Sequence, residues 1–133
     1  MRPIISVPIV SCLLSAGKPD FSDYYEILRY RKIPQPLKHR PGDQYYVMKV
    51  NGDSLLNEGI LDGHWIVYRV SSTANPGQLC VIATPHGETI KFFWPQADGT
   101  VLLRSANPDF PDQVWLVEEI RILGVVVQSG RDW

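Results

Sequence analysis

The chain has 133 residues, 44% of them hydrophobic and 20% charged, with a formal net charge of -1. A chain of this length and composition forms one globular domain with a real core. The lack of a basic excess argues against direct DNA binding by this segment, because binding to phosphates needs one. Two cysteines are too few for a disulfide framework. The apolar start is broken by prolines and too short to span a membrane. We therefore expect a cytoplasmic protein.

In chain order, the sequence predicts short strands separated by turns at intervals of roughly ten residues. Residues 7–15 are strand-like, residues 23–30 fit either a strand or a helix, and prolines make residues 33–44 a loop. Residues 54–60 fit one helical turn. Further strands are predicted at residues 45–50, 64–70, 78–84, 88–94, 100–105, 114–117 and 120–128. This pattern is typical of a mainly β domain.

Ser54 and Lys91 carry the strongest indication of chemistry. Ser54 follows Gly52-Asp53, where a glycine permits the tight bend that presents a hydroxyl. Lys91 lies in an apolar stretch, where burial would favour the neutral amine. A neutral lysine beside a serine hydroxyl is a general base beside a nucleophile. Each residue alone also has an ordinary explanation, as a turn serine and a solvated strand lysine.

Three motifs that occur in order resemble the self-cleaving LexA/UmuD peptidase family. They are Gly52-Asp53-Ser54, Gly59-Ile60-Leu61-Asp62-Gly63 and Thr89-Ile90-Lys91. Outside these motifs, Ser15-Ala16-Gly17 resembles the scissile bond of the family, and residues 107–110 resemble its asparagine-aromatic segment. Leu55 stands where the family usually has methionine, a change of similar volume that the core should tolerate.

The resemblance implies a compact LexA-like β-fold of several antiparallel strands with short helical turns. It implies that Ser54 attacks the Ala16–Gly17 bond of the same chain and that Lys91 takes the proton. The backbone N–H groups of Asp53 and Ser54 would stabilise the oxyanion. The chain then divides into an N-terminal arm with the cleavage site, residues 1–20, and a catalytic and dimerisation domain, residues 21–133.

The resemblance leaves the biological role open. A UmuD-like protein would serve, after cleavage, as the accessory subunit of an error-prone lesion-bypass polymerase, and the short stretch before Ala16 favours it. The alternatives are the C-terminal domain of a LexA-like or phage repressor, and a non-catalytic dimerisation module. The UmuD-like role and the repressor role both imply a homodimer whose cleavage in the SOS response is promoted by the RecA filament on single-stranded DNA.

Other residues are expected to have structural roles. Asp62 should bind backbone amides in a turn rather than act as a catalytic acid. Cys12 and Cys80 should be small core residues. No cofactor is expected, and no metal site, because the three histidines lack the spacing of metal ligands.

Overall fold

The computed structural model describes residues 2–12 and 25–131, and it confirms the mainly β fold. Within these described residues, nine strands form one sheet, with two short 3-10 helices in its connections. The strands are β1 (Ile4–Cys12), β2 (Tyr25–Pro34), β3 (Tyr45–Lys49), β4 (Trp65–Val70), β5 (Leu79–Thr84), β6 (Gly87–Pro95), β7 (Thr100–Arg104), β8 (Gln113–Leu116) and β9 (Arg121–Gly130). The 3-10 helices are η1 (Leu56–Glu58) and η2 (Val117–Glu119).

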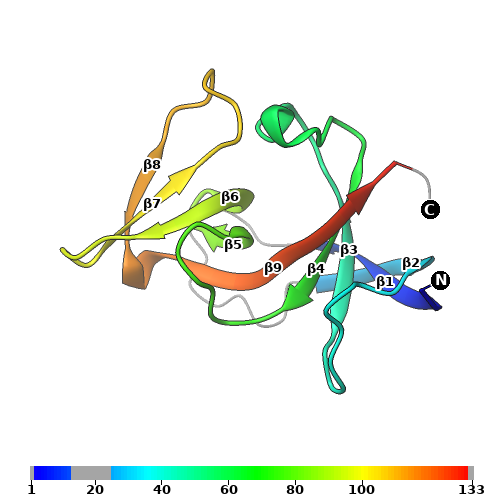
Figure 1. The fold of residues 1–133 in the computed structure, drawn as a ribbon. Helices are drawn as coiled ribbons and strands as arrows, with labels where there is room; N and C mark the ends of the chain where they lie inside the picture. Colours follow the sequence, from blue (N-terminus) through cyan, green and yellow to red (C-terminus); the bar gives the residue numbers. More distant parts are fainter. Residues whose placement is uncertain (1, 13–24, 132–133) are drawn as a thin grey trace.

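The strand order across the sheet is β2-β1-β3-β4-β9-β5-β6-β7-β8. Neighbouring strands are antiparallel except β1 and β3, which are parallel where Ile9 lies opposite Val47. The long strand β9 runs through the middle of the molecule and joins its two halves (Figure 1). Its first half pairs with β5 and its second half with β4. The sheet therefore has two wings that meet along β9.

Strand β9 needs a glycine at position 124, where it passes close to β4. A Cβ atom at Gly124 would collide with the Tyr68 ring and with the Arg69 carbonyl oxygen on β4. The register of β9 also shifts nearby against both of its neighbours, at Val67/Tyr68 on β4 and at Val81/Ile82 on β5. Such irregularities increase the local bend and twist of a sheet. They allow one continuous strand to serve both wings.

The first two predicted elements differ from the structure in their bounds. The strand expected at residues 7–15 begins at Ile4 and is described to Cys12; residues 13–15 lie outside the described part. The ambiguous segment at 23–30 is part of strand β2, which extends to Pro34 and so includes the first residues of the expected loop. Ile33 is fully buried and pairs with Ile5. Burial of this side chain against β1 outweighs the tendency of the nearby prolines to break the strand.

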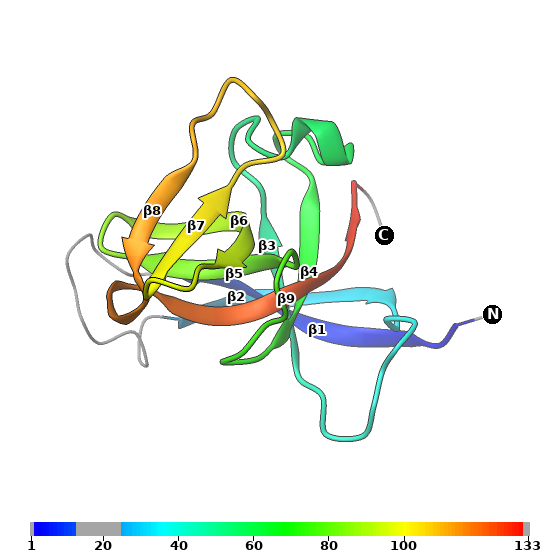
Figure 2. The same cartoon turned by 60° about the vertical axis from the view of Figure 1, so that its left-hand side comes forward.

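Two connections lie at the same end of the molecule in both views (Figures 1 and 2). One follows β3 and contains η1, and the other joins β7 to β8. A hydrogen bond of 2.7 Å from the Asn57 N–H to the Ala106 carbonyl ties the two connections together. No helix in the described part of the chain is long and apolar enough to cross a membrane.

Candidate functional site

Ser54 lies in the connection between β3 and η1, in a loop that we call the serine loop (residues 51–55). Gly52 has a φ of 90°, a left-handed conformation that glycine adopts without the steric cost of a side chain. Its N–H donates a 2.7 Å hydrogen bond to Asp62 Oδ1. The expected role of Asp62, binding a backbone amide at a turn, is thus confirmed.

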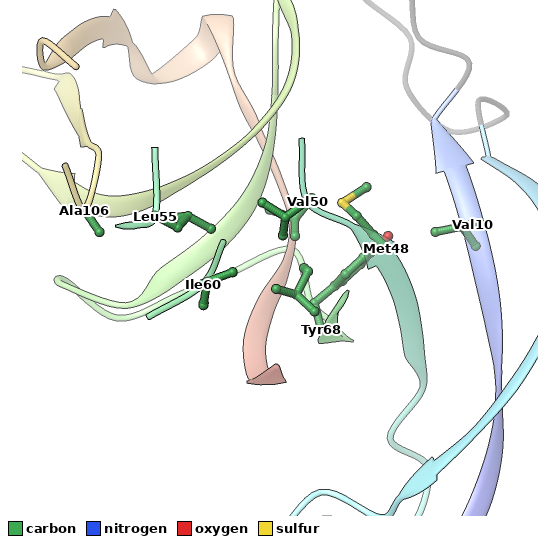
Figure 3. Packing of buried hydrophobic residues seen from close by; sticks show 9 residues of the cluster. Val10, Met48, Val50, Leu55, Ile60, Tyr68 and Ala106 are labelled. Atoms are coloured by element: carbon green, nitrogen blue, oxygen red, sulfur yellow. The ribbon is translucent and has the colours of Figure 1, made fainter. Parts of the chain in front are cut away.

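Leu55 anchors the serine loop in the core. Its side chain is fully buried in a cluster with Val50, Ile60 and Ala106. Val50 precedes the serine loop, Ile60 follows η1, and Ala106 lies in the β7–β8 connection. Figure 3 shows Leu55 between Ala106 and Val50, with Ile60 on a further side. Because the anchor is the residue immediately after Ser54, the backbone position of Ser54 depends on this packing.

Lys91 lies on β6 and is buried, with 7% of its surface exposed. This burial lowers the pKa of its ammonium group below the ordinary value. Its Nζ donates to Thr89 Oγ1 at 2.7 Å and to the Ile90 carbonyl oxygen at 3.4 Å. Both acceptors are uncharged, so neither favours the ammonium form as a carboxylate would. The prediction of a buried lysine is therefore confirmed, and Thr89 is a partner that the sequence did not reveal.

Ser54 and Lys91 line the same cleft, which has a volume of about 680 Å³. Its lining residues come from β1, β2, β3, the serine loop, β4, β6, the β7–β8 connection and the start of β8. Half of the eighteen lining residues are apolar: Ile9, Val10, Leu28, Met48, Val50, Leu55, Trp65, Ile90 and Phe110. Charged side chains on the cleft wall besides Lys91 belong to Lys49, Asp53 and Glu88. The structure thus brings together the two residues that the sequence singled out, from elements far apart in the chain.

Asp53 and Ser54, whose N–H groups are the predicted oxyanion donors, both line the cleft. The Asp53 carbonyl oxygen accepts hydrogen bonds from the Leu56 N–H at 3.2 Å and from Asn107 Nδ2 at 2.8 Å. The second bond joins residues 54 positions apart. The sequence marked Asn107 only by its resemblance to a family segment and gave it no role.

The predicted cleavage site, Ala16–Gly17, lies outside the described residues. Val10, the last residue of β1 whose side chain is described, lies on the cleft wall. Ala16 follows six residues later, and six residues of extended chain span up to about 20 Å. The predicted cleavage site is therefore separated from the cleft wall by only a few residues of sequence.

Residues 8–127 match the family model described as Peptidase S24-like. The chain belongs to this family. The resemblance to LexA/UmuD-type peptidases is thereby confirmed, and with it a serine-type peptidase family.

Curated relatives agree with this family. The chain is 33% identical over 132 residues to the LexA repressor of Ligilactobacillus salivarius, covering 95% of this chain and 58% of that protein. It is 34% identical over 127 residues to the LexA repressor of Lactobacillus gasseri, with coverage of 95% and 58%. For the LexA repressor of Pelagibacter ubique the identity is 27% over 129 residues, with coverage of 97% and 56%. The chain therefore spans a little over half the length of these relatives.

The described residues contain no group of three or more histidine, cysteine, aspartate or glutamate side chains that could hold a metal ion. Cys80 is fully buried on β5, and its burial raises the pKa of its thiol to about 12. This places Cys80 in the core, as expected. The side chain of Cys12 is outside the described part.

Proposed function

We propose that this domain is a self-cleaving serine peptidase that cuts its own Ala16–Gly17 bond, with Ser54 as the nucleophile and Lys91 as the general base. One observation carries the proposal: a serine on a tight loop and a buried lysine line the same cleft. Membership in the Peptidase S24-like family supports it. A solvated lysine could not serve in this way at moderate pH, because its amine would remain protonated.

In the proposed reaction, Ser54 Oγ attacks the carbonyl carbon of Ala16 while its proton passes to the neutral amine of Lys91. The carbonyl oxygen of Ala16 becomes an oxyanion that accepts hydrogen bonds from the Asp53 and Ser54 N–H groups. The bond to the Gly17 nitrogen then breaks, and the Lys91 ammonium returns the proton to the leaving amine. Water, deprotonated by Lys91, then attacks the ester carbon; the bond to Ser54 Oγ breaks, and the Lys91 ammonium returns the proton to this oxygen.

Attachment of the substrate to the same chain favours this reaction. A scissile bond held near the nucleophile converts a bimolecular step into an intramolecular one, with a large gain in effective concentration. Alanine and glycine at the bond fit a narrow cleft, and glycine allows the backbone to bend. The apolar residues of the cleft wall suit the neighbouring Leu13 and Leu14 of the same segment.

The proposal is tested by incubating the purified chain at alkaline pH and measuring fragment masses. A cut after Ala16 that is lost in Ser54→Ala and in Lys91→Ala supports it. An intact wild-type chain, both at alkaline pH and with activated RecA filament, contradicts it.

We propose two biological roles for the same cleavage. The names of the curated relatives favour the C-terminal domain of a LexA-like repressor, since cleavage would then separate this domain from a DNA-binding part. The other role is that of a UmuD-like accessory subunit of a lesion-bypass polymerase. The reading frame upstream of Met1 distinguishes them: an open frame that encodes a helix-turn-helix supports the repressor and contradicts the UmuD-like role.

Both roles include a homodimer and promotion of cleavage by the RecA filament on single-stranded DNA. Sedimentation of the purified chain tests the dimer, and a monomer at micromolar concentration contradicts it. Comparison of cleavage rates near neutral pH with and without the activated filament tests the promotion. An equal rate in both samples contradicts it.

A further inference from the structure

The peptide group between Asp53 and Ser54 accepts a hydrogen bond from a residue outside the serine loop. Its carbonyl oxygen accepts a 2.8 Å hydrogen bond from Asn107 Nδ2, in the β7–β8 connection. Asn107 is buried, with 7% of its surface exposed. The bond is part-buried, and a buried amide such as that of Asn107 costs free energy when it loses its hydrogen-bond partner.

The orientation of the Asn107 amide is itself fixed. Its Oδ1 accepts a 3.0 Å hydrogen bond from the Asp109 N–H, so its amide nitrogen is directed at Asp53. Its backbone carbonyl accepts a further bond of 3.1 Å from the Phe110 N–H. The neighbouring Ala106 is tied to Asn57, just beyond the serine loop, by a 2.7 Å backbone bond. The donor to Asp53 therefore lies on a segment that is bonded both to the serine loop, at Asp53, and to η1, at Asn57.

The geometry of the peptide unit makes this contact relevant to catalysis. The carbonyl of Asp53 and the N–H of Ser54 belong to the same planar group, and in a trans peptide they point in opposite directions. The described chain has no cis peptide bond. Fixing the carbonyl oxygen of Asp53 thus fixes the direction of the Ser54 N–H. A hydrogen bond to the carbonyl also polarises the peptide unit and strengthens its N–H as a donor.

We propose that Asn107 is a positioning residue that aims the Ser54 N–H into the cleft as an oxyanion donor. This inference rests on the proposed self-cleavage and adds a residue to it. Asn107 touches neither the scissile bond nor Lys91 in the proposed reaction, and it acts through the 53–54 peptide. The Leu56 N–H also donates to this oxygen, at 3.2 Å, and we expect this longer bond to persist when Asn107 is replaced, so that the Ser54 N–H is misaligned rather than lost.

Two variants isolate the contact. Asn107→Asp keeps an acceptor for the Asp109 N–H but removes the donor to Asp53, whereas Asn107→Ala removes both bonds. Removal of an oxyanion donor outright slows a serine peptidase by roughly 100- to 1000-fold. We expect both variants to slow self-cleavage by about 10- to 100-fold, because the N–H remains but is poorly aimed. The pH midpoint of the rate should stay unchanged in Asn107→Ala, because that midpoint reports Lys91.

A matched control variant shows how much a comparable loss of stability by itself slows cleavage. Ile33→Val lies in a different core cluster, on β2, and should cost about 0.5–1.5 kcal/mol of stability, comparable with the loss of one hydrogen bond. This variant should cleave at the wild-type rate. A rate in Asn107→Ala equal to that of Ile33→Val, or a rate loss in Ile33→Val as large as in the Asn107 variants, overturns the positioning role.

A second readout does not depend on cleavage. In chains kept intact by Lys91→Ala, the carbonyl carbon resonance of Asp53 and the amide resonance of Ser54 are compared with and without Asn107→Asp. We expect both resonances to move, while amides of β4 stay in place. Unmoved resonances overturn the inference even if the wild type cleaves itself. If the wild type stays uncut but the resonances move, the proposed self-cleavage is contradicted, whereas the claim that Asn107 orients the 53–54 peptide is supported.

Discussion

Replacement of Leu55 by alanine tests whether the serine loop is held by core packing. Leu55 is fully buried, and its neighbours Val50, Ile60 and Ala106 come from three separate parts of the chain. Removal of a fully buried leucine side chain costs about 2.7–5 kcal/mol, through lost transfer energy and a cavity that does not close. We expect a loss near 3 kcal/mol, because the loop end of this cluster can partly collapse.

The next residue provides a matched control. Leu56 is chemically identical but 45% exposed, so Leu56→Ala should cost about 1 kcal/mol or less. Leu55→Met, a change of similar volume, should cost less than about 1.5 kcal/mol. Urea unfolding followed by tryptophan fluorescence measures all three. Equal losses for Leu55→Ala and Leu56→Ala would refute the claim that Leu55 anchors the loop.

The same variants separate packing from chemistry. Self-cleavage is measured at a temperature at which every variant is folded. We expect Leu55→Ala to cleave at least about 10-fold more slowly than Leu56→Ala, because a displaced nucleophile loses much of the advantage of orientation. Equal rates in the folded variants would show that the position of Ser54 does not depend on this anchor.

Three further predictions concern stability and reactivity. Burial lowers the pKa of Lys91 in the folded chain below the ordinary 10.5 of the unfolded chain. Between these two pKa values the folded state binds fewer protons than the unfolded state, so the stability of the wild type rises with pH across this range. Lys91→Met should therefore be more stable than wild type at pH 7, and the difference should shrink toward pH 10.5 in urea unfolding; a constant difference would count against a depressed pKa. Cys80, whose thiol pKa is raised to about 12, should resist iodoacetamide at pH 8 in the folded chain and react on unfolding, as measured by the mass of its peptide; rapid labelling of the folded chain would contradict its burial. Gly124→Ala should lower the free energy of unfolding by about 1–3 kcal/mol, because its Cβ would meet the Tyr68 ring and the Arg69 carbonyl. A melting temperature equal to that of the wild type would show that β9 does not need this close approach.

The sequence predicted each strand from β3 to β9 to within two residues of its bounds, because turn residues separate these strands. Strand β5 is among them although its residues from Cys80 to Thr84 are all buried. The extent of β2 could not be predicted, because the burial of Ile33 depends on pairing with β1 and outweighs the nearby prolines. The pairing of β1 with both β2 and β3 is likewise a long-range property with no local signal.

For the site, the local motifs identified Ser54 and Lys91, and folding placed both on one cleft wall. The motif around Asp62 also predicted its bond to a backbone amide, since turn chemistry is local. Thr89 and Asn107 could not be assigned roles in this way. Their hydrogen bonds to Lys91 and to Asp53 depend on side-chain geometry and, for Asn107, on a contact between distant segments.

Self-cleavage tests the central claim most directly. Purified wild type, Ser54→Ala, Lys91→Ala and Lys49→Ala are incubated over a range of alkaline pH, and fragment masses are followed with time. Lys49 is an exposed lysine on the same cleft wall, so it controls for loss of positive charge there. We predict a single cut after Ala16 in the wild type, at a rate that rises with pH until Lys91 is mostly neutral, retained within a few-fold in Lys49→Ala and abolished in the other two. Cleavage that persists without Ser54 or Lys91, or a wild-type chain that stays intact even with activated RecA filament, would contradict the account.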